Sequence, residues 1–517
     1  MREAGGGEPE RDRSERGQPE RGQPERGREV EVLRARRESR ERLGDRAFAF
    51  SLEQALGVRE AETVASVREA HPSLEPDVLT EDRRALAGRV VLKRDIGKLV
   101  FLVLRDRTGD LQLVANQDTD PGSFALLREI DLGDVVGATG VVGTTRKGEL
   151  SLFVERLAVL SKALRPLPEK WHGLKDPDLQ QRQRYLQLAT DLDYRRVVAA
   201  RAETIRAFRR VLEERGFVEV ETPVLQLTHG GAIARPFLTH HQALDVDMNL
   251  RIALELFLKR LLVGGLERVY EIGRIFRNEG VDRDHNPEFT MLEAYQAYAD
   301  YETMMELSQA LIRASAIAVR GSLRFTYQDR EVDLESEWQR RTMLELVSEA
   351  TGEQITLERS DLAAIAERHG VEADPAWGPG KLVYELYEKL VEDGLWGPVF
   401  VCDLPREVSP LARPHRSKPG LVEHADLVLC GTELVPAYSE LSDPDEQRRS
   451  FEIQAAARAH GEEETHPMDE DFLTALEHGM PPAGGMGLGV DRLVMILADV
   501  PSIRDVILFP HHRPAEG

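Results

Sequence analysis

Apolar and polar residues alternate over short distances in the first third of the chain. Between Ala87 and about Leu160, short apolar runs are separated by turns that contain Gly, Asp and Lys. These runs predict five strands, at Arg89–Leu92, Leu99–Leu104, Leu111–Ala115, Val135–Val142 and Leu150–Leu157. Five short strands in so compact a stretch favour a small closed β-barrel.

Helical spacing appears after this strand-rich part. Apolar residues recur three or four positions apart between Tyr194 and Arg215 and stop at Gly216, which predicts one long amphipathic helix. A strand that ends at Pro223 follows. The segment Gly230 to Arg260 then places two glycines beside a polar turn and a helix that opens near Ala253.

The segment Arg274 to Asp300, RIFRNEGVDRDHNPEFTMLEAYQAYAD, predicts two antiparallel strands joined by a polar loop at Asn278–Pro287. Because side chains alternate between the two faces of a strand, one face of this hairpin carries Glu271, Gly273, Ile275, Arg277, Phe289, Met291, Glu293 and Tyr295. An arginine, an aromatic ring, a carboxylate and a phenol together are typical of a ligand-binding floor, on which Gly273 leaves room. A solvated face of an antiparallel sheet is the alternative interpretation.

Two glutamates nearer the C-terminus suggest a cation site. Glu433 and Glu440 are seven positions apart, so one regular strand would place them on opposite faces. A strand end or bulge between them, for which Pro436 is a candidate, would bring them together. The residues from about 335 to 397 are mostly helical and carry no candidate chemistry, so they are interpreted as an insertion beside the sheet.

A glycine-rich run, Gly484 to Gly489, leads into a predicted helix that carries Arg492 in its first turn. Glycines allow close approach of a ligand, and a helix N-terminus together with a guanidinium is a favourable phosphate site.

Composition and charge limit the classes of function. The net charge of −23 excludes a surface coated in nucleic acid, although a local basic face remains possible. Two cysteines are too few for a four-thiolate zinc site or a disulfide framework. No long apolar run and no signal-like start are present, so no membrane association and a cytoplasmic location are expected.

These patterns predict five regions. Residues 1–45 form a charged tail, disordered up to Gly27, and a basic helix at Arg28–Leu43; 46–86 are a helical lead-in, 87–162 the barrel, 163–190 a linker and 191–517 the main α+β domain. The basic helix is either a solvated mixed-charge helix or a support for nucleic-acid binding.

Three ordered motifs resemble those of class II aminoacyl-tRNA synthetases. The helix and strand up to Pro223 resemble motif 1, the hairpin resembles motif 2, and GVDRLVMIL resembles motif 3. The sequences RNEG and HNPEFT within the hairpin are similar to those of the lysine enzymes. The barrel is similar to the OB-fold anticodon-binding domain of these enzymes. The resemblance implies an antiparallel catalytic sheet flanked by helices and a homodimer that binds tRNA(Lys), L-lysine and ATP.

The resemblance also implies roles for particular residues. Arg277 and Arg492 would be catalytic. ATP would contact Arg277, Glu279, His285, Phe289, Glu433, Gly489 and Arg492. Lysine would contact Gly231, Glu255, Arg277, Glu293, Tyr295, Tyr438 and Glu440, with Glu255 at the α-ammonium group and Glu440 at the ε-ammonium group. The anticodon would contact Phe101, Gln112 and Glu149, supported by cations at Lys93, Arg94, Lys98 and Arg105, and Mg²⁺ would lie on Glu433 and Glu440.

One position departs from the common lysine-enzyme pattern, because Pro436 stands where an asparagine is usual. The segment ELVPAYSEL resembles the synthetase half of actinobacterial bifunctional proteins that also make lysyl-phosphatidylglycerol, and no membrane half is expected here. Three functions stay open: a lysine–tRNA ligase, a paralogue that makes lysyl-adenylate for another acceptor, and a non-catalytic tRNA-binding or regulatory module.

Overall fold

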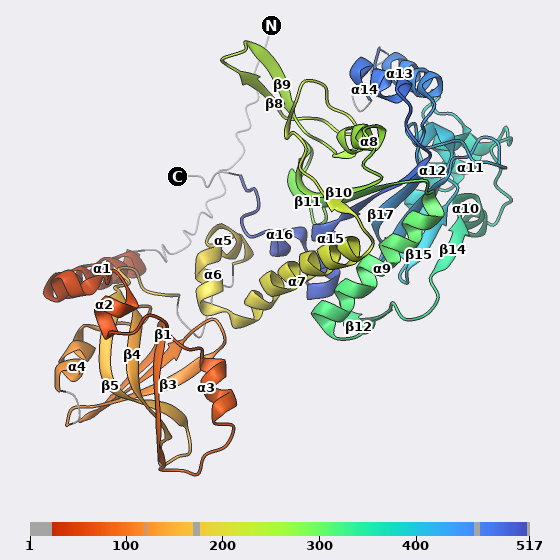
Figure 1. The fold of residues 1–517 in the computed structure, drawn as a ribbon. Coiled ribbons are helices and arrows are strands. Elements are labelled where there is room, and N and C mark those ends of the chain that lie inside the picture. Colours follow the sequence, from red (N-terminus) through yellow and green to blue (C-terminus); the bar gives the residue numbers. More distant parts are fainter. Residues whose placement is uncertain (1–22, 119–120, 169–175, 460–465, 514–517) are drawn as a thin grey trace, which may run out of the picture. The chain divides into compact units, whose positions relative to one another are not determined.

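The computed structural model describes residues 23–118, 121–168, 176–459 and 466–513, which fold into two compact units, Met1–Gly173 and Leu174–Gly517 (Figure 1). The tail expected to be disordered lies largely outside the described residues. Its last residues belong to helix α1 (Gln23–Leu43), which therefore begins earlier than the predicted start at Arg28.

The first unit contains a closed five-stranded barrel with the strand order β1-β2-β3-β5-β4. Its strands are β1 (Leu79–Ile96), β2 (Leu99–Arg105), β3 (Asp110–Asn116), β4 (Val135–Thr144) and β5 (Leu150–Ser161). Short helices surround it: η1 (Gly44–Ala47), α2 (Leu52–Leu56), α3 (Val64–Ala70), α4 (Pro121–Leu126) and η2 (Leu127–Glu129). All five predicted strands are confirmed.

Strand β1 corrects one boundary, because it begins at Leu79, inside the segment predicted to be a helical lead-in. Its charged first part, EDRR, has low strand propensity, but it pairs with β4 from Arg83, opposite Val141, onward. Backbone pairing across the barrel outweighs the local preference, which the sequence pattern alone could not reveal.

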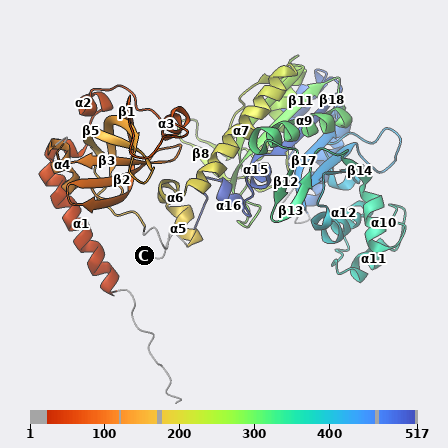
Figure 2. The ribbon, with the colours of Figure 1, turned by 90° about the horizontal axis from the view of Figure 1, so that it is seen from below.

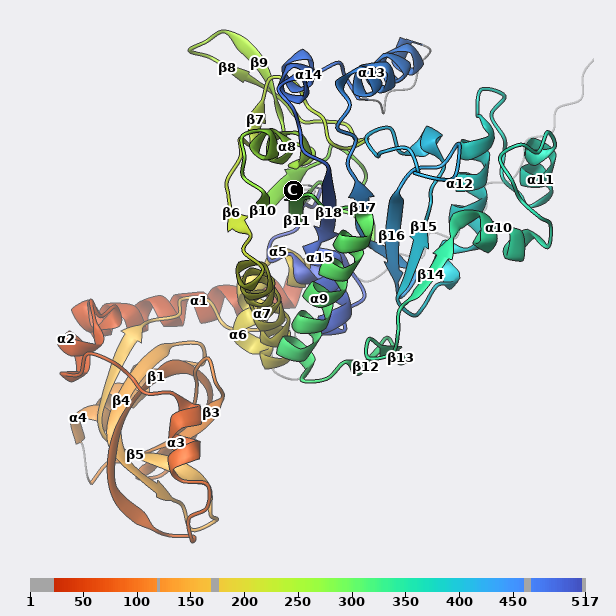
Figure 3. The same cartoon turned by 45° about the vertical axis from the view of Figure 1, so that its right-hand side comes forward.

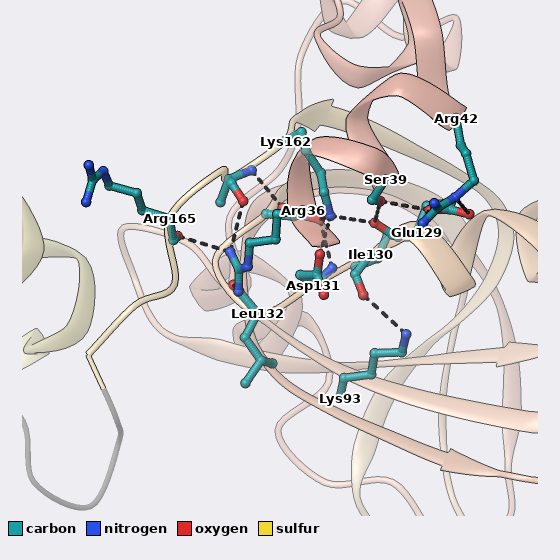
Figure 4. Close-up of polar contacts among 12 residues, drawn as sticks. Arg36, Ser39, Arg42, Lys93, Glu129, Ile130, Asp131, Leu132, Lys162 and Arg165 are labelled. Carbon is teal, nitrogen blue, oxygen red and sulfur yellow. Dashed lines mark hydrogen bonds and ion pairs between the residues drawn. The ribbon is translucent and has the colours of Figure 1, made fainter. Parts of the chain in front are cut away.

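Helix α1 packs against the barrel unit and is not a freely solvated helix (Figure 4). The buried Arg36 guanidinium donates hydrogen bonds to the carbonyls of Leu132, Ala163 and Arg165 at 2.9–3.0 Å. Arg42 forms a forked ion pair with Glu129 at 3.0–3.1 Å. Part of the basic character of α1 is therefore used to dock the helix.

The second unit is built on an eight-stranded sheet with the order β14-β15-β16-β17-β18-β11-β10-β6 (Figure 3). The pairs between β15 and β10 are antiparallel, and both edge pairs are parallel. The strands are β6 (Val218–Glu219), β10 (Arg268–Phe276), β11 (Glu288–Ala297), β14 (Gln339–Thr342), β15 (Val399–Cys402), β16 (His424–Leu429), β17 (Thr432–Ser439) and β18 (Ala483–Gly489).

Helices α7 (Leu192–Glu214), α9 (Tyr301–Arg320) and α15 (Val490–Ala498) cover one face of this sheet (Figure 3). The other face carries α8 (Glu255–Val263) and a small sheet of β7 (Leu225–Gln226), β8 (Leu238–His241) and β9 (Val246–Leu250). The remaining elements are α5 (Pro177–Arg182), α6 (Arg184–Thr190), β12 (Arg324–Tyr327), β13 (Arg330–Asp333), η4 (Arg406–Val408), α13 (Pro444–Ala459), α14 (Glu470–Glu477) and α16 (Ile503–Val506). The predicted linker thus ends in two helices.

The segment interpreted as an insertion is part of the main fold. It supplies the edge strand β14 and the helices α10 (Met343–Thr351), α11 (Leu362–Arg368), α12 (Pro379–Leu390) and η3 (Glu392–Gly394), which lie together beyond that edge (Figure 2). Leu382, Val383 and Leu386 of α12 share a buried cluster with Val399 and Val401 of β15. The helices therefore pack on the sheet through a common core.

Candidate active site

A cavity of about 760 Å³ lies over the sheet face opposite α7, α9 and α15. Every residue that the sequence predicted for ATP or lysine lines it: Gly231, Glu255, Arg277, Glu279, His285, Phe289, Glu293, Tyr295, Glu433, Tyr438, Glu440, Gly489 and Arg492. Residues from segments more than 200 positions apart thus meet in one site.

The hairpin has the predicted register. Ile275 pairs with Phe289, Gly273 with Met291 and Glu271 with Glu293, so these side chains share one face. The room at Gly273 is not left for a ligand, however. A Cβ there would collide with the guanidinium of Arg251, which is buried and forms an ion pair with Glu271 at 2.6 Å. Arg251 fills the gap that the sequence assigned to substrate.

Two arginines and an aromatic ring define one end of the cavity. The Arg277 guanidinium lies over the Phe289 ring at 5.2 Å, and its Nε donates to the carbonyl of Ile252 at 3.3 Å. Desolvation lowers the pKa of Arg277, although a guanidinium remains charged at neutral pH. A flat cation beside an aromatic plate can accommodate a phosphate next to a planar base.

Arg492 connects the motif 2 loop with the glycine-rich segment. Its guanidinium donates to the carbonyl of Glu433 and to Nε2 of His285, both at 3.0 Å. Because a guanidinium can only donate, His285 Nε2 accepts, and Nδ1 carries the proton toward Asp282 at 2.9 Å. These contacts hold Arg492 and His285 side by side at the cavity wall.

Asp491 fixes the start of α15, and sequence reasoning missed it. Its carboxylate accepts a hydrogen bond from the Thr290 backbone N–H at 2.6 Å and forms an ion pair with Arg201. The Arg201 guanidinium also donates to Thr290 Oγ1 at 2.7 Å. The contacts tie α7, β11 and α15 together and so position the neighbouring Arg492.

Glu433 reaches the cavity through a β-bulge, as predicted, but the bulge lies before Pro436. Val428 pairs with Glu433 and Leu427 with Val435, which leaves Leu434 as the extra residue. One extra residue reverses the alternation, so Glu433 joins the face of the strand that carries Glu440.

Asp426, rather than Glu440, is the carboxylate beside Glu433. Burial and repulsion from Asp426 raise the pKa of Glu433 to about 8, and Arg492 opposes this shift. Glu440 forms an ion pair with Lys259 instead. Asp426 is therefore a further candidate ligand beside the predicted pair Glu433 and Glu440, and the sequence offered no signal for Asp426 without the register of β16.

The carboxylates of Glu433 and Asp426 suit Mg²⁺. Within the described part of the chain, no group of three or more His, Cys, Asp or Glu residues could hold a metal. Two carboxylates whose remaining coordination is completed by phosphate oxygens and water is the usual arrangement for Mg²⁺.

Four acidic or phenolic groups gather at the other end of the cavity. Glu293 accepts hydrogen bonds from the Leu254 N–H at 2.9 Å and the Tyr295 hydroxyl at 3.0 Å, and burial raises its pKa to about 7. Glu255 and Glu440 both contact the ammonium of Lys259. Because one atom bridges them, Glu255 lies near Glu440; the role of Glu255 at the α-ammonium group stays a prediction.

His424 links Asp426 to Tyr438. Its ring stacks on Tyr438 with centroids 4.2 Å apart, and its Nε2–H donates to Asp426 Oδ1 at 2.8 Å. Ser409 Oγ lies 2.8 Å from His424 Nδ1. All of these side chains line the cavity, as does Pro436, which pairs with Asp426 in the sheet.

Helix α12 contributes Tyr384 and Glu388 to the cavity wall. The sequence assigned no chemistry to this region, so this contribution was missed. Tyr384 and Glu388 reach the cavity because α12 packs against the sheet, and a local sequence pattern does not predict such long-range packing.

A second candidate surface lies on the barrel of the first unit. Residues 99–105 alternate between half-buried and buried, and Phe101 is half-buried on the outward side. Phe101 pairs with Val114 and Gln112 with Val103, so Phe101 and Gln112 share a face, which the Gln112–Ser151 hydrogen bond at 2.9 Å continues onto β5. The exposed Glu149 precedes that strand. Phe101 is thus a surface platform and not a core residue.

Three of the four barrel cations assigned to a phosphate backbone are already paired. The Lys93 ammonium donates to the carbonyl of Leu127 and to that of Ile130, and Figure 4 shows the second contact. Lys98 pairs with Asp118 and Arg105 with Asp110. The fold uses part of these charges, and Arg94 and Lys98 are the exposed members of the set.

Comparisons with known proteins agree with this geometry. Residues 176–513 match the model of the family described as tRNA synthetases class II (D, K and N), and residues 85–160 match the OB-fold nucleic acid binding domain. The chain is 53% identical over 445 residues to a lysine–tRNA ligase of Moorella thermoacetica, which covers 85% of this chain and 91% of that protein. It is 49% identical over 462 residues to a lysine–tRNA ligase of Thermosynechococcus vestitus, with 87% and 91% covered. The chain belongs to the class II tRNA synthetase family of the D, K and N type.

Proposed function

We propose that this protein is a lysine–tRNA ligase, which activates L-lysine with ATP and transfers it to the 3′ end of tRNA(Lys). The observation that carries this proposal is the polarity of the cavity. Arg277 lies over Phe289 and Arg492 contacts His285 and Glu433, where a triphosphate with its cation would bind, and Glu255 and Glu440 share Lys259 near Glu293 and Tyr295, where a lysine side chain would bind. The similarity to lysine–tRNA ligases along most of their length supports it.

The first step needs positioning more than a protein nucleophile. The carboxylate of lysine attacks the α-phosphorus of ATP in line, forming lysyl-adenylate and releasing pyrophosphate. Arg277 would bridge the lysine carboxylate and the α-phosphate, and Phe289 would stack on adenine. Glu279, His285, Gly489 and Arg492 would hold the rest of the nucleotide, and the terminal ribose hydroxyl of tRNA would then attack the adenylate.

Glu433 and Asp426 would hold Mg²⁺ with the nucleotide. When bound there, the ion supplies charge neutralisation for the leaving pyrophosphate. His424 orients Asp426 through its Nε2–H, and Arg492 orients the Glu433 backbone. The repulsion between Glu433 and Asp426 supports this assignment, because a cation would relieve it.

Lysine selectivity would come from the carboxylate end. Glu293, Tyr295 and Glu440 would surround the ε-ammonium, now with Glu255 beside Glu440, and Gly231 and Tyr438 would shape the pocket. An analogue without the ammonium would leave these buried carboxylates unpaired, which is a strong basis for rejection.

The barrel would read the anticodon. Phe101 would stack on one base, while Gln112 and Glu149 would contact its polar edge. We also propose that the arginines on the outer side of α1, namely Arg34, Arg37 and Arg40, support tRNA binding, because they are exposed while Arg36 is buried.

We further propose a homodimer, in which α7 and β6 form the interface. Large apolar side chains are exposed on β6 and on or beside the small sheet β7-β9-β8: Val218, Leu225, Leu227, Leu238 and Leu244. Within the described residues, no helix is both long and apolar enough to span a membrane. We place the protein in the cytoplasm, and we propose that its pocket is related to the synthetase half of the bifunctional lysyl-phosphatidylglycerol proteins through ELVPAYSEL.

Lysine-dependent exchange of pyrophosphate into ATP, followed by charging of tRNA(Lys), tests the proposal. A lysine–tRNA ligase performs both reactions. Exchange without charging would indicate a different acceptor for lysyl-adenylate, and absence of both would indicate a non-catalytic module. Sedimentation measurements of mass in solution test the dimer.

A further inference from the structure

The lysine end of the cavity contains an ammonium group that belongs to the chain itself. Lys259 on α8 is fully buried, and its Nζ contacts Glu255 Oε1 at 2.5 Å and Glu440 Oε2. Both carboxylates line the cavity, and Lys259 is behind them. One oxygen of each carboxylate is therefore occupied before any ligand arrives.

The second oxygen of Glu440 lies against Gly485 and the ring of Tyr295. A Cβ on Gly485 would collide with Glu440 Oε1 and with the ring of Tyr295, so the missing side chain at Gly485 makes room for both groups. Tyr295 in turn donates its hydroxyl to Glu293. Glu440 is thus held beside Tyr295 and Glu293, the groups proposed to surround the lysine side chain.

The charges at this site balance only if Lys259 is included. The cavity contains the carboxylates of Glu255, Glu293 and Glu440, and Arg277 lies at its other end. His466 contributes no charge, because burial lowers its pKa to about 4. With both Lys259 and Arg277 counted, the three ionised carboxylates leave one net negative charge, which matches the one net positive charge of lysine; without Lys259 they would leave two.

We propose that Lys259 is a specificity-determining and positioning residue for lysine activation. It acts as a built-in counter-ion that holds one oxygen of Glu255 and one of Glu440, so that the remaining oxygens accept the substrate ε-ammonium. The inference rests on the proposed lysine activation. It differs from a purely structural role, in which the ion pairs would only tie α8 to β17.

The ion pairs of Lys259 would favour lysine over an amino acid with a neutral side chain. Three buried carboxylates without a counter-ion would repel one another and bind protons, and a protonated carboxyl group accepts a neutral side chain more readily. With Lys259 in place, a single ligand cation completes the balance. A neutral side chain of the same length leaves the surplus negative charge buried.

The variant Lys259→Met keeps the length and apolar volume of the side chain and removes its charge. Pyrophosphate exchange should show a KM for lysine raised on the order of tenfold or more, with KM for ATP unchanged. The preference for lysine over norleucine, which lacks the ε-ammonium, should fall by a similar factor. Circular dichroism and thermal melting check that the variant is folded.

The double variant Lys259→Met with Glu255→Gln separates the two roles. It removes one carboxylate together with its counter-ion, so KM for lysine should be lower than in Lys259→Met alone. A purely structural role predicts a further loss. If Lys259→Met does not fold, the same comparison of lysine with norleucine is made on the double variant, which leaves fewer buried carboxylates unpaired.

Two results would overturn the inference. One is a KM for lysine within twofold of the parent protein in the folded Lys259→Met variant. The other is an equal rise of KM for lysine and ATP, which would mean a general distortion of the site. Loss of lysine-dependent exchange in the parent protein itself would instead refute the proposed function, so the two failures are distinguishable.

Discussion

The two ends of the cavity pair their charged side chains in different ways. At the nucleotide end, Arg277 and Arg492 donate to neutral acceptors, namely backbone carbonyls and the imidazole of His285. At the amino-acid end, Glu255 and Glu440 already share the ammonium of Lys259. At the first end the carboxylates of Glu433 and Asp426 lie beside the arginines, where a cation would accompany the phosphates, and at the second Lys259 offsets one carboxylate, so that this end suits a ligand with one net positive charge.

Removing a cation from the nucleotide end is the largest expected perturbation. Arg277→Ala should lower the rate of pyrophosphate exchange by about a thousandfold, because it removes a donor aimed at charge that develops on the α-phosphate. Arg274→Ala is the matched control, since Arg274 lies on the opposite face of β10 and is largely exposed. Near-normal exchange in Arg277→Ala would contradict the motif 2 assignment.

Replacing one acidic residue at each end of the cavity with its amide separates metal binding from lysine binding. Asp426→Asn should raise the Mg²⁺ concentration needed for half-maximal exchange by about 10–100-fold, with little change in KM for lysine. Glu440→Gln should do the reverse. A Mg²⁺ requirement that shifts in Glu440→Gln but not in Asp426→Asn would restore the original pairing of Glu433 with Glu440.

A substitution in the barrel should leave both ends untouched. Phe101→Ala should weaken tRNA charging by about 1–3 kcal/mol through loss of one stacked base, while pyrophosphate exchange stays constant. Phe50→Ala, an exposed phenylalanine of the same unit, serves as control. Equal damage to charging and exchange would mean that Phe101 supports the fold of the whole protein.

Acidic pH should weaken lysine binding. Burial raises the pKa of Glu293 to about 7, and its ionised form is the one that accepts an ammonium. As pH falls through 7, Glu293 gains a proton that lysine must displace, so KM for lysine should rise by up to about tenfold per pH unit. Glu293→Gln should remove the part of the trend centred near pH 7, whereas the effects of Glu433 and Glu440, whose pKa values burial raises to about 8, should remain.

Pro436 is expected to have the smallest effect. Proline offers no N–H and no side-chain amide, so Pro436→Asn should lower KM for lysine by about 0.5–1.5 kcal/mol, the contribution of one hydrogen bond. Selectivity for lysine should persist in both proteins. Preference for ornithine or arginine in a screen of amino acids would refute the substrate assignment.

Local patterns predicted much of this architecture, because they depend on neighbours along the chain. The hairpin followed from period-two alternation around a polar loop, and the α15 start followed from glycines before Arg492. The barrel strands followed from short apolar runs, except for the first part of β1, where charged side chains conceal the strand.

What the sequence could not provide depends on contacts between distant segments. Asp426 lies beside Glu433 only because of the register in which β16 pairs with β17. Arg251 directly follows strand β9, and its guanidinium fills the space beside Gly273. Lys259 is four positions from Glu255, which reads as an ordinary surface pair on a helix. Its partner Glu440 directly follows strand β17, far away in the sequence, so the burial of Lys259 could not be predicted.

The bulge at Leu434 makes the length of β17 more critical than its composition. Leu434 is buried, and another apolar side chain there would disturb packing only locally. Deleting that single residue together with the bulge would leave Glu433 six positions before Glu440, so regular alternation would still place both carboxylates on the cavity face. Straightening the strand at its present length would instead rotate Glu433 toward the helices that cover the sheet, so the bulge and the length of the strand should change only together.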